Sequence, residues 1–143
     1  MASMHESVTL IATNETGDHH ESIEICFTTR PPYQLKATRN GAEGATFTGT
    51  HLMNCLRQLR FSLESEGLLL CCQGARPDVT LSGMQSQMAD GRFVYVFDKS
   101  TGTVGAEQID IFAPADCADV VSTTVQRAEV FSFYGLEDPR AEH

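Results

Sequence analysis

The sequence predicts an α+β fold: a mostly antiparallel sheet, one long amphipathic helix packed on a face of that sheet, and a second, C-terminal helix. Two observations lead to this prediction. Short segments with alternating hydrophobic residues follow one another near the N-terminus, which is typical of antiparallel strands. One segment of helical period comes after them, followed by further strands and a last helix. Helices and strands are therefore segregated rather than alternating as in a parallel sheet.

Three strands are predicted before the long helix. Residues 8–13 form the first, and the polar stretch after it indicates a loop because it contains glycine. In residues 22–29 and 33–38 hydrophobic and polar side chains alternate, as they do in half-buried strands. The pair Asn40-Gly41 is typical of a turn. Residues 41–50, which follow it, are expected to be loosely structured.

The clearest helix is predicted over residues 50–66. Its hydrophobic residues recur on one helical face. Thr48 or Thr50 can cap its N-terminus, and Gly67 stands where a left-handed residue commonly ends a helix. We expect this helix to pack across the sheet. The polar residues expected on its outer face are His51, Asn54, Arg57, Gln58, Arg60 and Glu64.

The second half of the chain predicts two central strands and a last helix. Residues 68–72 are apolar throughout, which indicates a strand covered on both faces, and residues 92–97 indicate the second central strand. Residues 98–105 form a turn-rich connection, and residues 107–112 form a short strand or an extended segment. Residues 116–134 have a helical pattern, with a separate last helix starting at position 122 or 123 as an alternative.

Length and charge restrict the class of protein. A chain of 143 residues fits a single domain over 1–143, in which residues 1–20 and 136–143 are expected to be partly flexible. No stretch approaches the ~20 apolar residues that span a bilayer, and the N-terminus lacks a secretory signal, so no membrane association is expected. The net charge of −9 argues against direct nucleic-acid binding and favours basic partners.

The cysteines and histidines predict neither a disulfide framework nor a metal site. Five cysteines stand at positions 26, 55, 71, 72 and 117, with no CxxC spacing. They are expected to be free and buried, which predicts a reducing cytoplasm as the location. His19 and His20 are adjacent in a polar stretch, and adjacent histidines rarely converge on one ion. No metal or other cofactor is therefore expected.

The sequence offers little support for catalysis. The Leu81-Ser82-Gly83-Met84 stretch lacks the first glycine of G-x-S-x-G, and His51 is the only histidine placed on a predicted regular element. No nucleotide-binding or H-E-x-x-H motif is present. The chain is therefore not expected to be an enzyme. The alternative is a small enzyme with a polar site formed by Arg76, Asp78, Ser82 and Asp110 at the end of the sheet.

Residues 74–91, GARPDVTLSGMQSQMADG, connect the two predicted central strands. Arg76 can project from a turn or can pair with Asp78 or with a carboxylate at the end of the sheet. Ser82 can cap a short helix in which Met84 and Met88 share one face. The two methionines then either close the core or form an adaptable contact surface. As a partner-binding surface, this segment would use Arg76, Asp78, Met84, Met88 and Asp90.

This segment resembles the loop of a group of small bacterial proteins of the form GARxxVxxSGM. The likeness covers about residues 20–134, and it departs from the pattern at Thr80-Leu81, where an aromatic residue and a proline are expected. Genes of this group look like immunity genes of polymorphic toxin systems. The matching residues are Gly74-Ala75-Arg76, Val79, Ser82-Gly83-Met84, Met88, Gly91, Ile109-Asp110-Ile111-Phe112 and Pro114-Ala115-Asp116.

The resemblance implies an immunity protein, which binds a cognate bacterial effector toxin and blocks its active site or its access to substrate. The acidic charge agrees with a basic toxin such as a nuclease. A third hypothesis is a structural protein that forms a homodimer through a sheet edge or through the 74–91 segment.

Overall fold

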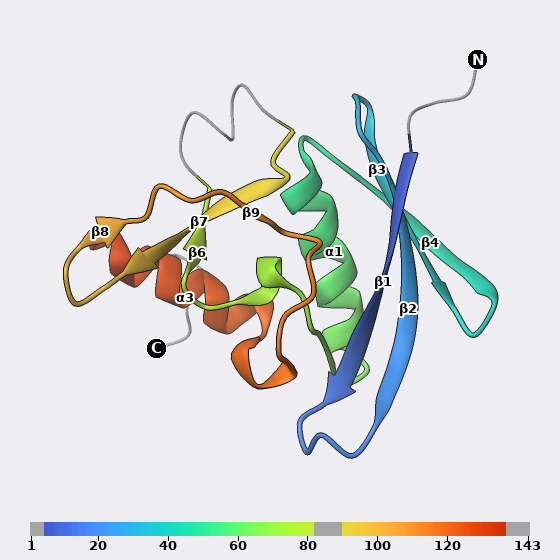
Figure 1. Ribbon diagram of the computed structural model, residues 1–143. Helices are drawn as coiled ribbons and strands as arrows, with labels where there is room; N and C mark the ends of the chain where they lie inside the picture. The colour runs from blue at the N-terminus through green and yellow to red at the C-terminus, as the bar shows by residue number, and fades with distance from the viewer. Residues whose placement is uncertain (1–4, 82–89, 137–143) are drawn as a thin grey trace.

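The computed structural model describes residues 5–81 and 90–136, which form two antiparallel sheets and two α-helices (Figure 1). The predicted α+β class with a mostly antiparallel sheet is confirmed. The larger sheet has five strands in the spatial order β4-β3-β2-β1-β5. Their bounds are β1 (His5–Asn14), β2 (His20–Thr28), β3 (Tyr33–Arg39), β4 (Ala42–Gly49) and β5 (Leu68–Leu70).

Alternation along the strands places the hydrophobic side chains of the larger sheet on one face. Ile23 and Phe27 are buried, whereas Glu24 between them is exposed. The register sets Leu10 of β1 opposite Ile23, and Leu35 of β3 opposite Phe27. Because directly paired residues point to the same side of a sheet, three neighbouring strands present one continuous hydrophobic face.

Helix α1 (Leu52–Glu64) lies on one side of this sheet and covers its hydrophobic face (Figure 1). The imidazole Nδ1 of His51 accepts a hydrogen bond from the N–H of Asn54 at 3.0 Å and so caps the helix. The expected cap at Thr48 or Thr50 is wrong, since Thr48 still belongs to β4. Gly67 has φ 78°, which confirms the left-handed residue expected after the helix.

The smaller sheet is arranged around its longest strand, β7. Its strands are β6 (Val79–Thr80), β7 (Phe93–Asp98), β8 (Thr103–Val104) and β9 (Ile109–Asp110), and each of the other three pairs with β7 in antiparallel fashion. The prediction of a central strand at residues 92–97 is therefore correct. The strand predicted at residues 68–72 is present as β5, and Leu68, Leu70, Cys71 and Cys72 are buried as expected. Its predicted central place is wrong, because β5 is a three-residue edge strand that pairs only with β1 among the described residues.

The other helices within residues 5–81 and 90–136 are two 3-10 helices and a last α-helix. They are η1 (Gln73–Ala75), η2 (Cys117–Asp119) and α3 (Thr123–Phe133). Ser122 caps α3 by accepting a hydrogen bond from the N–H of Val125, so the alternative start at position 122 or 123 is correct. The ring centroids of Phe133 and Phe97 lie 4.4 Å apart. This contact joins α3 to the smaller sheet. No helix of the described residues is long and apolar enough to cross a membrane.

Two segments that were expected to be irregular form strands. One is β4 within residues 41–50, and the other is β8 within residues 98–105. A tight turn with positive φ at Asn40 and Gly41 leads the chain back from β3 into β4. β4 is a polar strand at the edge of the sheet, so it lacks the hydrophobic alternation from which strands are predicted. Its pairing with β3 contains a bulge.

The cysteines differ from the prediction. Cys71 and Cys117 form a disulfide, whereas Cys26, Cys55 and Cys72 are free. Neighbouring side chains of an extended segment point in opposite directions, so Cys71 reaches η2 while Cys72 is buried in the core. The disulfide removes the argument for a reducing cytoplasm that was based on free cysteines.

Candidate functional site

The candidate site is the 74–91 segment together with the surface beside it. The segment runs from η1 near the edge of the larger sheet to β7 of the smaller sheet. Residues 74–81 and 90–91 belong to the described part of the chain. Ser82, Met84 and Met88, which the sequence suggested as a helix cap and as contact residues, lie outside the described residues.

Arg76 braces the first turn of the segment. Its guanidinium donates to both carboxylate oxygens of Asp78, at 3.0 and 2.8 Å, and to the side-chain oxygen of Gln73 at 2.9 Å. The pairing of Arg76 with Asp78 is one of the alternatives that the sequence left open. The side chain of Arg76 is 25% exposed, so its role in the turn leaves part of the guanidinium within reach of a partner.

A buried polar cluster lies beneath this turn. Arg60 of α1 is 1% exposed, so its expected place on the outer face of the helix is wrong. Its Nη1 donates to the side-chain oxygen of Gln126 and to the carbonyl of Gly74, at 2.5 and 3.3 Å, and its Nη2 donates to the carbonyl of Val121 at 2.9 Å. Burial lowers the pKa of Arg60, because a cation in a dry interior loses its hydration.

Gln126 completes the cluster from α3. Its side-chain Nε2 donates to the carbonyls of Gly74 and Arg76, at 2.7 and 2.8 Å. Gly74 itself has no room for a side chain, since a Cβ there would lie 2.8 Å from Cβ of Ile111. The start of the segment is therefore fixed to α1, to α3 and to the residue after β9. The helical spacing of position 60, four residues after Leu56, was the signal for an inward-facing Arg60.

The other end of the segment contacts the start of α1. The carbonyl of Asp90 accepts a hydrogen bond from the N–H of Leu52 at 2.6 Å. Gly91 has φ 73°, and a Cβ at this position would lie 2.7 Å from Cβ of His51. Burial lowers the pKa of His51, which favours the neutral ring whose Nδ1 can accept the capping hydrogen bond. Both ends of the segment are thus fixed against the same helix.

Arg92 connects the two sheets directly after the segment. Its Nη2 lies 2.6 Å from a carboxylate oxygen of Glu6 in β1 and 3.0 Å from one of Asp110 in β9. Its guanidinium also lies over the ring of Phe27, 5.1 Å from the centroid. Asp110 is therefore paired with Arg92, whereas Asp78 is paired with Arg76. The two carboxylates of the enzymatic alternative belong to separate ion pairs.

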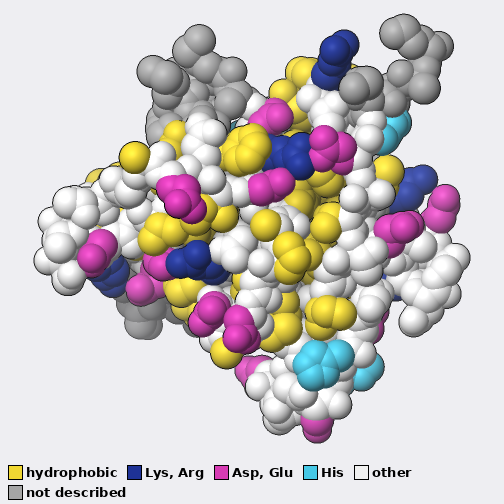
Figure 2. Space-filling model, viewed as in Figure 1, with side chains coloured by type: hydrophobic (Ala, Val, Ile, Leu, Met, Phe, Trp, Pro, Cys, Tyr) yellow, Lys and Arg dark blue, Asp and Glu magenta, His cyan; other side chains and the backbone are white. Residues whose placement is uncertain are grey.

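An acidic groove opens beside the first turn of the segment. It has a volume of about 380 Å³, and its three carboxylates come from Asp78, Asp98 and Glu129. Hydrogen bonds from Ser100 lower the pKa of Asp98, so that this carboxylate is ionised at neutral pH. Figure 2 shows acidic side chains (magenta) over the viewed face of the molecule, several of them beside basic ones (dark blue). The residues that line the groove are Pro77, Asp78, Val96, Phe97, Asp98, Lys99, Ser100 and Glu129.

Asp98, Lys99 and Glu129 had no sequence signal as site residues. Lys99 Nζ lies 3.4 Å from a carboxylate oxygen of Glu129, while Asp98 accepts hydrogen bonds from the N–H and hydroxyl of Ser100. The groove joins a turn, the end of β7 and the exposed side of α3. Residues so far apart in the sequence form a common site only through the tertiary fold, and no local pattern marks them.

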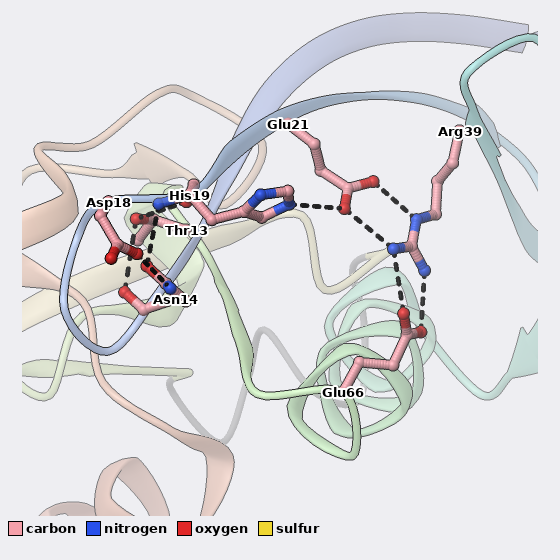
Figure 3. A network of polar contacts seen from close by, with 7 residues as sticks. All are labelled: Thr13, Asn14, Asp18, His19, Glu21, Arg39 and Glu66. Carbon is pink, nitrogen blue, oxygen red and sulfur yellow. Dashed lines mark hydrogen bonds and ion pairs between the residues drawn. The ribbon is translucent and has the colours of Figure 1, made fainter.

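A second polar network includes His19 and extends through Glu21 and Arg39 to Glu66 (Figure 3). Arg39 of β3 donates to Glu21 at 2.7 Å and to Glu66, after α1, at 2.8 Å. These hydrogen bonds hold the pKa values of both carboxyls below their ordinary range. His19 Nε2 lies 3.7 Å from Glu21. Within residues 5–81 and 90–136, no group of three or more His, Cys, Asp or Glu side chains is placed to hold a metal ion.

Neither protein-family models nor curated proteins match this chain. The functional conclusion therefore depends on the residues and geometry described above.

Proposed function

We propose that this chain is an immunity protein, which binds a cognate bacterial effector toxin and neutralises it by covering the toxin's active site or its access to substrate. The observation that carries the proposal is the acidic groove. Its three carboxylates, Asp78, Asp98 and Glu129, outnumber its one lysine, Lys99, around a hollow of about 380 Å³. Within the described residues, Asp98 is the carboxylate of the three that has no ion pair, since Asp78 pairs with Arg76 and Glu129 with Lys99. A hollow of this charge suits a basic side chain, because complementary charges steer association and select the partner.

The class of toxin follows from the charge. Enzymes that cleave nucleic acids need Lys and Arg around the phosphates of their substrate. A protein of net charge −9 that places carboxylates around a hollow can cover such a surface and compete with the substrate. The field of the acidic chain also speeds the encounter with a basic partner. The proposed mechanism is steric blockade, and it assigns no catalytic step to this chain.

The proposed contact residues belong to the 74–91 segment, and the described ones lie at its two ends. Asp78 lines the groove, Arg76 is partly exposed beside it, and Asp90 stands at the opposite end. Met84 and Met88 are proposed as hydrophobic anchors, which supply most of the affinity in many interfaces. The enzymatic alternative finds less support, because Asp78 and Asp110 each pair with a different arginine.

Co-expression tests the proposal. The chain is produced together with a candidate toxin, taken from the genes that neighbour its own, and growth of the host and co-elution of the two proteins in gel filtration are measured. We expect growth to be restored and the two proteins to elute as one complex. If growth is not rescued and the proteins elute separately, the immunity proposal is refuted.

A charge reversal then tests the groove itself. Asp98→Lys places a cation among the groove carboxylates, and we expect association with the toxin to slow about tenfold at low salt. Glu24→Lys is the matched control, since Glu24 is also exposed but lies on β2. Equal association rates for the two variants would show that the toxin binds elsewhere on the molecule.

Light scattering tests the hypothesis of a structural homodimer. Measured on the chain alone at low micromolar concentration, it separates a homodimer from a monomer.

A further inference from the structure

A basic and aromatic patch lies where α1 and α3 meet. Each helix contains an arginine that is followed four residues later by a phenylalanine: Arg57 and Phe61 in α1, and Arg127 and Phe131 in α3. Residues four apart lie on the same face of a helix, so the two side chains of each pair are neighbours. In α3 the guanidinium of Arg127 lies over the ring of Phe131, 4.8 Å from its centroid.

The contact between the helices brings the two arginines together. The end of α1 meets the start of α3 through the hydrogen bonds between Glu64 and Thr123, and the helices run in opposite directions from there. Arg57, two turns before Glu64, therefore lies beside the middle of α3, which contains Arg127. The pKa of Arg57 is lowered, because neighbouring groups remove part of its hydration and because Arg60 and Arg127 repel its charge.

The α1 half of the patch is open to solvent. Phe61 is 69% exposed, the largest exposed fraction of any large hydrophobic side chain among the described residues, and Arg57 is exposed beside it. Within residues 5–81 and 90–136, Arg57 has no ion pair with a carboxylate. Five other basic side chains do have one, namely Lys36, Arg39, Arg76, Arg92 and Lys99.

The patch is separate from the acidic groove. Glu129 of the groove follows Arg127 by two positions in α3. Two positions correspond to a rotation of about 200° around an α-helix, so the two side chains point to opposite sides of α3. A ligand at the patch therefore leaves the groove accessible.

We propose that this patch binds a short acidic segment of a partner protein, whose carboxylates pair with Arg57 and Arg127 and whose neighbouring hydrophobic side chain covers Phe61. Charge selects this occupant, because guanidiniums bind carboxylates and repel basic segments. The segment is short, since the net charge of −9 repels a large acidic protein. A second copy of this chain fits less well: a two-fold contact through the patch would set both arginines against the same two residues of the other copy.

Selection from a peptide library tests the proposal. A phage-displayed library of random peptides is selected on the immobilised wild-type protein, and the enriched peptides are synthesised with a fluorophore for anisotropy titrations. We expect Asp or Glu next to a large hydrophobic residue in the enriched sequences. Their affinity should fall at least about tenfold for Arg57→Glu and for Phe61→Ser, and binding should weaken in about 1 M salt, where the Debye length is about 3 Å.

Three matched variants serve as controls. Arg30→Glu makes the same charge change at an exposed position between β2 and β3, and Val104→Ser removes another exposed hydrophobic side chain, from β8. Both should bind the peptides as wild type does. Asp98→Lys, in the groove, should not weaken peptide binding either, which separates this surface from the proposed toxin site. Because Arg57 and Phe61 are exposed, their variants should keep the circular dichroism spectrum of the wild type.

Three results would overturn the proposal. The first is a selection that enriches no acidic sequences, or acidic peptides that bind Arg57→Glu as tightly as wild type. The second is an equal loss of affinity in Arg30→Glu, which would mean that the peptides respond to net charge alone. The third is a wild-type dimer in light scattering that Phe61→Ser dissociates, which would assign the patch to a second copy of the chain. None of these measurements involves the toxin.

Discussion

Replacement of Gln126 by leucine is expected to weaken the fold at the base of the 74–91 segment. Gln126 is 3% exposed and makes three side-chain hydrogen bonds: it accepts one from Arg60 and donates one each to the carbonyls of Gly74 and Arg76. In Gln126→Leu the carbonyl of Gly74 still receives a hydrogen bond from Arg60. The carbonyl of Arg76 loses its donor from Gln126, and the buried cation loses one acceptor.

The expected cost follows from these losses. A buried carbonyl left without a donor costs about 1–3 kcal/mol, and a lost hydrogen bond to a charged group costs about 1.5–3 kcal/mol. The larger buried apolar surface of leucine offsets about 1–2 kcal/mol of this sum. We therefore expect the free energy of unfolding of Gln126→Leu to fall by about 2–3 kcal/mol. Thr124→Leu, on an exposed position of the same helix, is the control and should stay within about 0.5 kcal/mol of wild type.

Urea unfolding of four proteins tests this reasoning: the wild type, Gln126→Leu, Arg60→Met and the double variant. In the double variant the shared Arg60–Gln126 hydrogen bond is lost only once, whereas the carbonyl of Gly74, which keeps one donor in each single variant, loses both. The costs of the single variants should therefore not add, and we expect a coupling energy of about 1–2 kcal/mol in magnitude. A cost below about 0.5 kcal/mol for Gln126→Leu, or strict additivity of the two single variants, would refute the role assigned to this cluster.

Three further predictions concern other contacts. Arg39→Gln should lower the free energy of unfolding at pH 7 by about 1–2 kcal/mol. The pKa values of Glu21 and Glu66 are depressed in the folded protein, so their contribution to stability depends on ionisation. Unfolding measured over an acid titration should therefore show that wild type loses its advantage over the variant as the pH falls below about 4.5. Thermal unfolding of wild type should show a further loss of stability as the pH falls below 6.5, because the pKa of His51 is lowered by folding; His51→Asn keeps a capping oxygen and should lack this loss. Gly74→Ala should cost about 1–3 kcal/mol in urea unfolding, because the added Cβ meets Ile111 at 2.8 Å, whereas Gly105→Ala should be nearly neutral.

Local patterns were sufficient to predict the elements that bury one regular face. The alternation along β2 and β3 and the hydrophobic repeat of α1 depend only on neighbouring residues, so their places in the sequence could be read directly. β4 could not be predicted in this way, since it is an edge strand with little hydrophobic surface. The assignment of β5 and β7 to two separate sheets also depends on long-range strand pairing, which no periodicity encodes.

The site was predicted only in part for the same reason. The ion pair between Arg76 and Asp78, which are close in the sequence, was one of the alternatives that the sequence left open. Arg60 was assigned to the surface because arginine is rarely buried, although its position in the helical repeat places it among leucines. The acidic groove needs Glu129 beside Asp78, and the Cys71–Cys117 disulfide joins residues that are 46 positions apart. Both depend on the path of the whole chain.

The edge strand β4 has a consequence for how this chain behaves at high concentration. An exposed strand edge offers free backbone groups to any other strand and can nucleate intermolecular aggregation. Two features of β4 oppose this. The bulge opposite the Lys36–Thr38 part of β3 disturbs its regular spacing, and Gln58 of α1 donates to the carbonyl of Thr48 at 2.7 Å. Helix α1 therefore does more than cover the core, because one of its side chains also occupies a backbone acceptor of the edge strand.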